Sequence, residues 1–169
     1  WYTWGMTELS FESLCRAPFG QLEEIVRTQA APSLASLAGW EFRGFNVMAL
    51  TEALRIRKFK KGFYADARDP ERLYGYNVRV EQNGRQRPWL PVLRGEQPLR
   101  HGLYDVTRVD QDGPYPNSLL LDYGCGRNPT LDPSRLLRDY LVQADANDPD
   151  VLVGKAYLAV GPLRIPGGY

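Results

Sequence analysis

The stretch Leu37-Ala-Gly-Trp-Glu-Phe-Arg-Gly-Phe-Asn46 decides the fold that the sequence predicts. A probable helix precedes it, a Gly-Trp pair opens it, and polar and aromatic residues then alternate up to Gly44. Alternation with a period of two is typical of a half-buried strand. The stretch therefore predicts the chain leaving a helix and starting the first strand of a sheet.

Helical patterns lie on both sides of this stretch. Apolar residues recur at helical spacing from Phe19 to Val26, with charged residues on the other face, until Pro32 breaks the pattern. After the stretch, residues 47–54 contain good helix formers, and Asn46 is a suitable N-cap. We expect an N-terminal helical segment over residues 17–38 and one or two further short helices.

The rest of the sequence consists mostly of short runs typical of strands. They cover residues 57–64, 74–81, 89–93, 103–109, 118–123 and 151–160. Residues 136–143 read equally well as a strand or as the continuation of a helix that starts near Asp132. Asn83-Gly84 is the strongest hairpin signal in the chain.

About eight to ten regularly spaced strands favour an antiparallel sandwich or barrel over a parallel sheet. We expect a mainly β fold, a single antiparallel β-barrel over residues 39–169, within one domain of residues 1–169.

Composition restricts the class of protein. The chain has 43% hydrophobic and 24% charged residues, which is typical of an ordinary globular domain. With 21 Lys and Arg against 20 Asp and Glu, it lacks the basic excess of most nucleic-acid-binding proteins, so we expect no nucleic-acid partner. No apolar run approaches the roughly 20 residues of a membrane span, so we expect no integral membrane segment. The oligomeric state stays open, with a homodimer among the options.

The N-terminus and the cysteines predict a compartment. Residues 1–5 lack the basic start and apolar region of a signal peptide, and Met6 is the expected native start. Without an export signal, Cys15 and Cys125 are expected to be free thiols in the cytoplasm.

Three segments resemble the calycin-type domains with a GxWxxxG signature, which are related to lipocalins and fatty-acid-binding proteins. Residues 37–44 resemble the opening signature, residues 53–63 the helix-then-strand run that follows, and residues 138–156 the closing hairpin. The resemblance implies a small β-barrel with an apolar or amphipathic pocket. It also implies that Trp40 plugs the closed end of the barrel.

The first functional hypothesis is binding of a small hydrophobic or amphipathic molecule, such as a fatty acid or another lipid, inside the barrel. Aromatic side chains would line the pocket and an arginine would pair with a carboxylate. The candidate ligand-binding residues are Trp40, Tyr74, Tyr76, Arg79, Tyr104, Arg108 and Tyr123. Which of them point inward depends on the strand register, because a slip of one residue inverts the faces.

The alternative hypothesis is an enzyme of the isomerase or cyclase type that acts on an apolar substrate by acid/base chemistry. The candidate catalytic residues are Asp122, His101, Tyr104 and Asp105. Two converging titratable groups in the pocket would favour this hypothesis over binding alone. A third option is a barrel with a filled interior that acts through its surface.

Other motifs give weaker signals. Cys125 lies between two glycines beside Arg127, which could lower the pKa of its thiol, but a turn is the simpler interpretation. His101 is the sole histidine and cannot build a multi-His zinc site, although it could serve as a lone haem ligand or a base. Residues 145–150 lack the Gly and Glu of a calcium loop. We therefore expect neither a metal nor a cofactor.

The basic run of residues 55–61 is expected to be split between two faces of a strand. Lys61 shares one face with Phe59, whereas Lys58 and Lys60 lie on the other. We expect these charges to be solvated.

Overall fold

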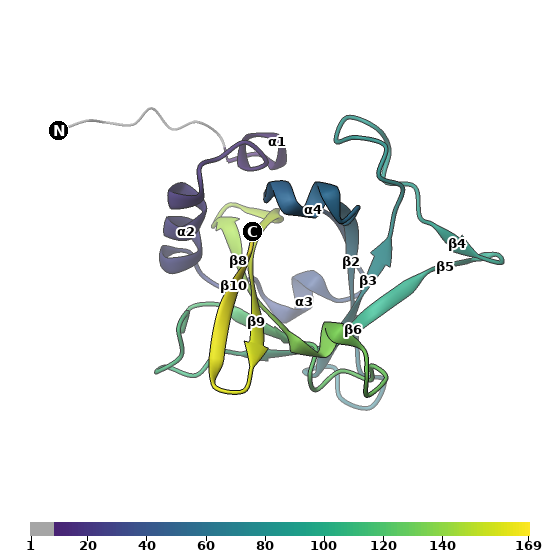
Figure 1. The fold of residues 1–169 in the computed structure, drawn as a ribbon. Coiled ribbons are helices and arrows are strands. Elements are labelled where there is room, and N and C mark those ends of the chain that lie inside the picture. Colours follow the sequence, from purple (N-terminus) through teal and green to yellow (C-terminus); the bar gives the residue numbers. More distant parts are fainter. Residues whose placement is uncertain (1–8) are drawn as a thin grey trace.

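A computed structural model describes residues 9–169, and of Ala49 and Leu50 only the backbone. The fold is mainly β, with a few short helices (Figure 1). The helices are α1 (Phe11–Leu14), α2 (Phe19–Thr28), α3 (Leu34–Leu37), α4 (Ala49–Ala53) and the 3-10 helix η1 (Pro133–Leu136). The main sheet contains β1 (Glu41–Phe45), β2 (Lys58–Ala65), β3 (Leu73–Arg79), β6 (Arg100–Arg108), β7 (Leu119–Asp122), β8 (Leu137–Asp145), β9 (Asp148–Val160) and β10 (Leu163–Gly168). A small hairpin of β4 (Leu93–Arg94) and β5 (Gln97–Pro98) projects from it.

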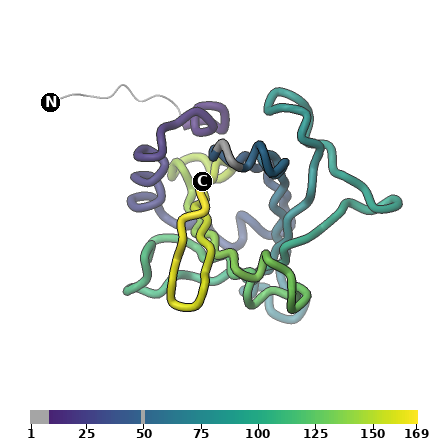
Figure 2. The backbone as a smooth tube through the Cα atoms, in the orientation of Figure 1, coloured from purple at the N-terminus to yellow at the C-terminus, as the bar shows by residue number. Residues whose placement is uncertain are grey.

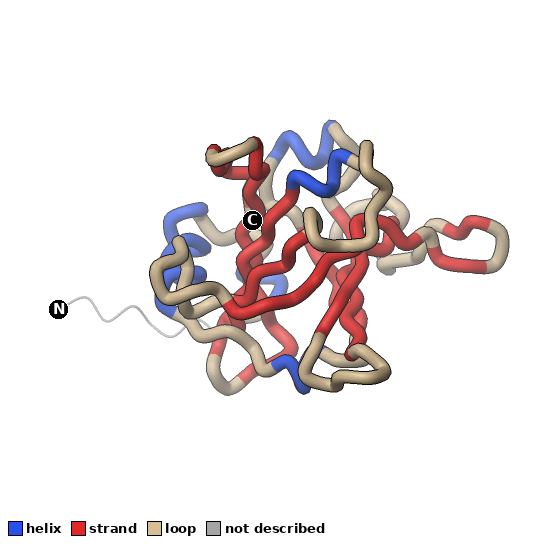
Figure 3. The backbone as a smooth tube through the Cα atoms, turned by 90° about the horizontal axis from the view of Figure 1, so that it is seen from below, coloured by secondary structure: helices blue, strands red, loops and turns tan. Residues whose placement is uncertain are grey.

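The eight strands of the main sheet follow one another in chain order, and all neighbours are antiparallel. The sheet curls into a half-barrel, as the backbone tube shows from two sides (Figures 2 and 3). Beyond the two edge strands, the backbone N–H of Val47 donates a 2.9 Å hydrogen bond to the carbonyl of Tyr169. The mainly β, antiparallel prediction is confirmed in this form, as a curled sheet.

Glycines in the strands make the tight curl compatible with large rings. Gly44 is paired with Phe59, Gly62 with Tyr76 and Gly75 with Tyr104 on the neighbouring strand. A Cβ atom at any of these three glycines would overlap the aromatic ring opposite. Each ring therefore lies over the backbone of its glycine partner, an arrangement that shields the glycine and fixes the register.

Two hydrophobic clusters cover the two faces of the sheet. On the concave face, Leu37 from α3 is fully buried with Phe63, Tyr104 and Leu121. On the outer face, apolar residues of α2 such as Val26 pack against β8 and β9. Figure 1 shows α3 inside the curve of the sheet and α2 outside it.

The predicted helix from Phe19 and the predicted strand in residues 40–45 are confirmed as α2 and β1. Of the ambiguous residues 136–143, Leu136 ends η1 and the others lie in β8, which forms a hairpin with β9. Asn83-Gly84 does not form a tight two-residue hairpin, because only an isolated bridge between Val80 and Pro91 pairs the flanking segments. Gly84 nevertheless adopts the positive φ of 91° that the motif favours. The prediction that Met6 is the native start lies outside the described residues.

The expectation that Trp40 plugs the barrel is wrong. Its side chain is 66% exposed, whereas Leu37, three residues earlier, is fully buried. The cause lies at Gly39, whose φ of 83° turns the chain sharply between α3 and β1. This turn directs the leucine into the core and the tryptophan toward solvent.

Candidate functional site

A cavity of about 160 Å³ is lined by residues of both hydrophobic clusters, such as Phe63 from the concave face and Leu22 from the cluster that contains α2. The sheet contributes Phe42, Phe59, Phe63, Leu121, Leu141 and Leu152 to its lining. The N-terminal segment contributes Phe11 and Leu14 from α1, Cys15 directly after α1, and Leu22 from α2. The lining is largely apolar, with Arg43, Lys61, Asp139 and Asp150 as its charged members. Such a combination of an apolar wall with few polar groups is typical of sites for small molecules.

Lys61 and Asp139 meet on the wall of this cavity, although 78 residues separate them in sequence. The Lys61 ammonium lies 2.9 Å from Asp139 Oδ2 and donates a 2.6 Å hydrogen bond to the Tyr123 hydroxyl. The Tyr123 hydroxyl donates in turn to Asp139 Oδ2 at 2.9 Å, and it also accepts a hydrogen bond of 3.1 Å from Asn77 Nδ2. Two charged groups therefore converge at the cavity around a single phenol.

Burial determines the protonation of the two tyrosines behind this pair. Burial and the nearby Asp139 raise the pKa of Tyr123 well above its ordinary value, so the phenol keeps its proton at neutral pH. Burial also raises the pKa of Tyr104, whose hydroxyl donates to the Gly62 carbonyl at 2.9 Å. The Lys61 ammonium lies 4.9 Å from the centre of the Tyr104 ring. The tyrosines thus support the charged pair, and Lys61 and Asp139 are the groups in position for chemistry.

Cys15 also lines the cavity, but its thiol is not activated. Burial raises its pKa to about 11, so the thiolate is scarce at neutral pH. The cysteine therefore acts as part of the apolar wall.

Among the predicted ligand-binding residues, Tyr104 and Tyr123 belong to the cluster behind the cavity wall. The others lie elsewhere. Tyr74 and Tyr76 stack on Tyr64, and Trp40, Arg79 and Arg108 are exposed and outside the cavity lining. The face shared by Tyr74 and Tyr76 is the outer one, so the curl of the sheet turns them away from the cavity.

None of the predicted catalytic residues is in the cavity lining, and Tyr104 lies in the cluster behind the wall. Asp105 and Asp122 are cross-strand partners. Partial burial and the neighbouring Asp122 raise the pKa of Asp105. Asp122 forms a 3.2 Å ion pair with Arg138 and accepts hydrogen bonds from the backbone N–H groups of residues 124 and 125, so it holds a turn together. His101 is exposed on β6, opposite Asn77.

One alternative and one expectation about charged groups are contradicted. The pKa of the Cys125 thiol is raised, chiefly by the negative charge of Asp122, so Arg127 does not activate it. The basic run of residues 55–61 is divided between two strand faces, as predicted. The prediction that these charges are solvated is wrong for Lys58 and Lys61. The Lys61 side chain is only 12% exposed and Lys58 only 3%, because both strand faces are covered at this position.

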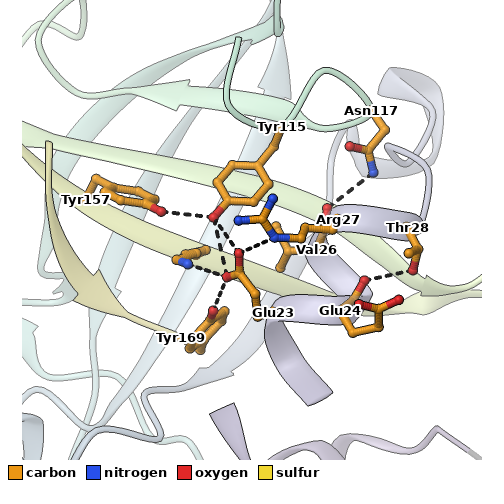
Figure 4. A network of polar contacts seen from close by, with 10 residues as sticks. Glu23, Glu24, Val26, Arg27, Thr28, Tyr115, Asn117, Tyr157 and Tyr169 are labelled. Carbon is orange, nitrogen blue, oxygen red and sulfur yellow. Dashed lines mark hydrogen bonds and ion pairs between the residues drawn. The ribbon is translucent and has the colours of Figure 1, made fainter. Parts of the chain in front are cut away.

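A second polar network connects α2 with the end of the sheet (Figure 4). Its centre is the Glu23 carboxylate, which accepts hydrogen bonds from Lys155, Tyr169 and Tyr115 and pairs with Arg27 at 2.6 Å. Burial alone would raise the pKa of Glu23, but these hydrogen bonds outweigh it and lower the pKa to about 2. The network therefore holds an ionised carboxylate that fastens the helix to the sheet.

Comparisons with known proteins give no relative: no family model, no curated protein and no solved structure matches the chain. No helix in residues 9–169 has the length and apolar character needed to cross a membrane. Within the same residues, no group of three or more His, Cys, Asp or Glu side chains could hold a metal ion. The cavity and its polar wall are therefore the basis for assigning a function.

Proposed function

We propose that the protein binds a small hydrophobic or amphipathic molecule in the cavity on the concave side of its sheet. The observation that carries the proposal is the largely apolar cavity on whose wall Lys61 and Asp139 form an ion pair. Apolar area would supply the binding free energy, and the polar pair would orient the ligand.

The size of the cavity narrows the ligand class. An apolar cavity of roughly 150 Å³ accommodates a benzene-sized ring, whereas sites for larger ligands span roughly 300–1,000 Å³. At about 160 Å³, the cavity suits a single ring or a short chain better than a long-chain fatty acid. We therefore favour a compact ligand within the hydrophobic class.

The charged pair favours a ligand without net charge. Asp139 already neutralises the Lys61 ammonium. Two of the three N–H donors of Lys61 are used by Tyr123 and Asp139, and no residue in 9–169 donates a hydrogen bond to Asp139 Oδ1. A donor and an acceptor side by side match an amide, a hydroxyl group or a protonated acid.

We also retain the calycin-like barrel as a proposal for the fold class. The order of elements supports it, since a helix and a Gly-Trp strand come first and a hairpin of long strands follows near the end. The hydrogen bond from Val47 to Tyr169 supports closure of the curled sheet. We propose a cytoplasmic location as well, and the free thiols of Cys15 and Cys125 support it.

The test combines ligand capture with direct binding. Purified protein is extracted with organic solvent and the extract is analysed by mass spectrometry. Saturation-transfer NMR then compares benzamide, benzoate and palmitate. We expect benzamide to bind more tightly than the two anions, because it offers both a donor and an acceptor without a charge.

A cavity-filling variant provides the specific control. Gly154 lines the cavity, and a Cβ there would lie 3.6 Å from Leu141 Cδ1, an ordinary contact, so Gly154→Leu should fold and occupy the cavity. Gly20→Leu places the same side chain in open space on α2. Binding that both variants retain, or an empty extract together with no binding of any probe, would rule out the proposal.

Acid/base catalysis in the same cavity is the second candidate function, and the convergence of Lys61 and Asp139 favours it. Asp139 Oδ1 could accept a proton from a substrate carbon, and the Lys61 ammonium could stabilise the resulting anion. Tyr123 keeps its proton and would serve as a hydrogen-bond donor.

Deuterium exchange separates catalysis from binding. A captured ligand is incubated with the protein in D₂O, and exchange of its carbon-bound hydrogens is followed by NMR. Catalysis predicts exchange that Asp139→Asn abolishes while binding persists. If the ligand binds but exchanges no faster than in buffer, the enzyme hypothesis fails and the binding hypothesis stands.

A further inference from the structure

A second hollow, of about 350 Å³, lies between the turn that follows α4 and the loop that follows β3. It is lined by Phe45, Glu52, Arg55, Arg57, Lys58, Gln82, Gly84 and Arg85. The cavity proposed for the hydrophobic ligand shares only Phe45 with it. The hollow is therefore a separate site with a different chemistry.

Positive charge is concentrated in this hollow. Its described lining contains four cations and one carboxylate, a net charge of +3 (four minus one), whereas the whole chain carries +1. Glu52 pairs with Arg57, and Glu12, outside the lining, lies 3.2 Å from Arg85. These two carboxylates leave an excess of positive charge. In a concave site with low-dielectric walls, such an excess attracts anions strongly.

Lys58 supplies part of this excess from a buried position. Its ammonium donates to Asn83 Oδ1 at 2.6 Å and to the carbonyls of Gly84, Arg87 and Pro88 at 3.0–3.1 Å. The same group lies 4.1 Å from the centre of the Trp89 ring. All of these direct partners are neutral, and the carboxylate of Glu81 acts on Lys58 only at longer range, so the ammonium forms no direct ion pair among the described residues.

Arg57 has an unused donor beside the hollow. Its Nε is buried and finds no hydrogen-bond acceptor within residues 9–169. Its guanidinium lies 5.0 Å from the centre of the Phe45 ring, and that of Arg85 lies 5.7 Å from the same ring. Two guanidinium groups therefore flank one aromatic ring. Buried donors without a partner are rare, and each calls for an explanation such as a role in the site or a bound water or ion.

Arg55 occupies a position where the backbone favours glycine. Its φ is 55°, and residues 51–56 close α4 with hydrogen bonds from Arg55 N–H to the Glu52 carbonyl and from Ile56 N–H to the Thr51 carbonyl. This is the Schellman pattern, in which the left-handed residue is usually glycine. An arginine is strained there, and strained residues concentrate at functional sites.

We propose that this hollow binds a phosphomonoester. A phosphomonoester carries nearly two negative charges at neutral pH, and its three terminal oxygens match the planar donors of guanidinium groups. Arg55 and Arg57 would hold the phosphate, Lys58 would add its field from behind, and Phe45 would contact the organic part. The volume exceeds that needed for a bare phosphate ion and leaves room for a small organic group.

Isothermal titration calorimetry with phenyl phosphate tests the proposal. We expect Arg57→Gln and Arg55→Gly each to weaken binding about tenfold or more, because each removes a charge-assisted contact. Glu52→Gln should tighten binding about threefold, since it removes a carboxylate that competes for Arg57. Arg94→Gln, which removes an exposed arginine outside the hollow, should leave the affinity unchanged.

Arg55→Gly separates function from structure. Glycine relieves the strained backbone, so the Tm should stay the same or rise while phenyl phosphate binding is lost. Retained benzamide binding in this variant would show that the hydrophobic cavity is intact. The proposal is overturned if wild-type protein shows no saturable heat with phenyl phosphate, or if Arg55→Gly and Arg57→Gln bind it as tightly as Arg94→Gln does.

A second arm identifies the source of the phosphate. Flotation compares phosphatidylcholine vesicles with and without phosphatidic acid, a lipid that bears the same monoester group. Flotation that requires phosphatidic acid and Arg57, together with phenyl phosphate binding, assigns the hollow to a lipid headgroup. Phenyl phosphate binding without flotation assigns it to a soluble phosphate.

Discussion

Replacing Glu23 by glutamine is expected to destabilise the protein, because this carboxylate joins α2 to the far end of the sheet. Lys155, Tyr169 and Tyr115 all donate hydrogen bonds to it. A glutamine has one carbonyl oxygen and no charge, so it cannot accept the same set of donors. The largely buried Lys155 ammonium, 12% exposed, would lose its counter-charge.

The pKa of Glu23 gives the size of its contribution to the free energy of unfolding. The network lowers this pKa from its ordinary value of 4.5 to about 2. Each tenfold change in proton affinity is worth about 1.4 kcal/mol, so the ionised carboxylate contributes about 3 kcal/mol to the free energy of unfolding. Because the folded-state pKa is the lower one, this contribution is complete above pH 4.5 and is lost as the pH falls toward about 2.

Urea unfolding, followed by tryptophan fluorescence at a series of pH values, measures this contribution. Glu24→Gln is the matched control, because Glu24 is the next residue of α2 and is exposed. We expect Glu23→Gln to be about 3 kcal/mol less stable than the control at neutral pH, with a difference that shrinks in acid. Equal stability of the two variants at neutral pH, or a difference that does not change with pH, would refute the reasoning.

Three further substitutions test other contacts, each by urea unfolding at neutral pH. Lys58→Met removes the donor shared by four oxygen acceptors and should lower the free energy of unfolding by about 2 kcal/mol or more. Amide hydrogen exchange in residues 83–88 should become faster, and an unchanged exchange rate would contradict this. Gly126→Ala should lower the free energy of unfolding by about 2 kcal/mol, because its Cβ would overlap a backbone carbonyl of β6. An unchanged stability would show that the backbone of β6 can shift to make room. Tyr104→Phe should cost about 1 kcal/mol, because the Gly62 carbonyl loses its donor, and a stabilised variant would argue against that hydrogen bond.

Local periodicity was sufficient to predict most elements of the fold. The helical spacing from Phe19 to Val26 became α2, and residues 151–160, which the sequence predicts as a strand, lie within β9. Alternation in a strand places Tyr74 and Tyr76 on the same face, and both rings contact Tyr64. It did not reveal which face points inward, because both faces of β3 carry buried residues.

The candidate site could not be predicted because it depends on the curl of the sheet. Lys61 lies on β2 and Asp139 on β8, four strands away in the order of the sheet. Nothing local in the sequence indicates that these two strands face each other across the concave side. The glycine–aromatic pairs, such as Gly75 with Tyr104, were the one available signal of strong curvature.

The basic run shows a related limit. Alternation correctly placed Lys58 and Lys61 on opposite faces, and a charged residue on a strand is usually solvated. Here a loop covers one face and the curled sheet covers the other, so both ammonium groups are buried. Burial of this kind depends on contacts with residues 83–88 and with Asp139, which lie far away in sequence.

The placement of α2 imposes an order on folding. Neighbouring strands of the main sheet follow one another in the chain, with only the β4–β5 hairpin inserted between β3 and β6, so each strand can pair as soon as the next one exists. Helix α2 precedes the whole sheet in sequence, yet it packs against β8 and β9. The hydrogen bond of Glu23 can form only with Lys155, 132 residues later in the chain. We therefore expect α2 to dock late, and Glu23→Gln to accelerate unfolding while leaving the folding rate nearly unchanged.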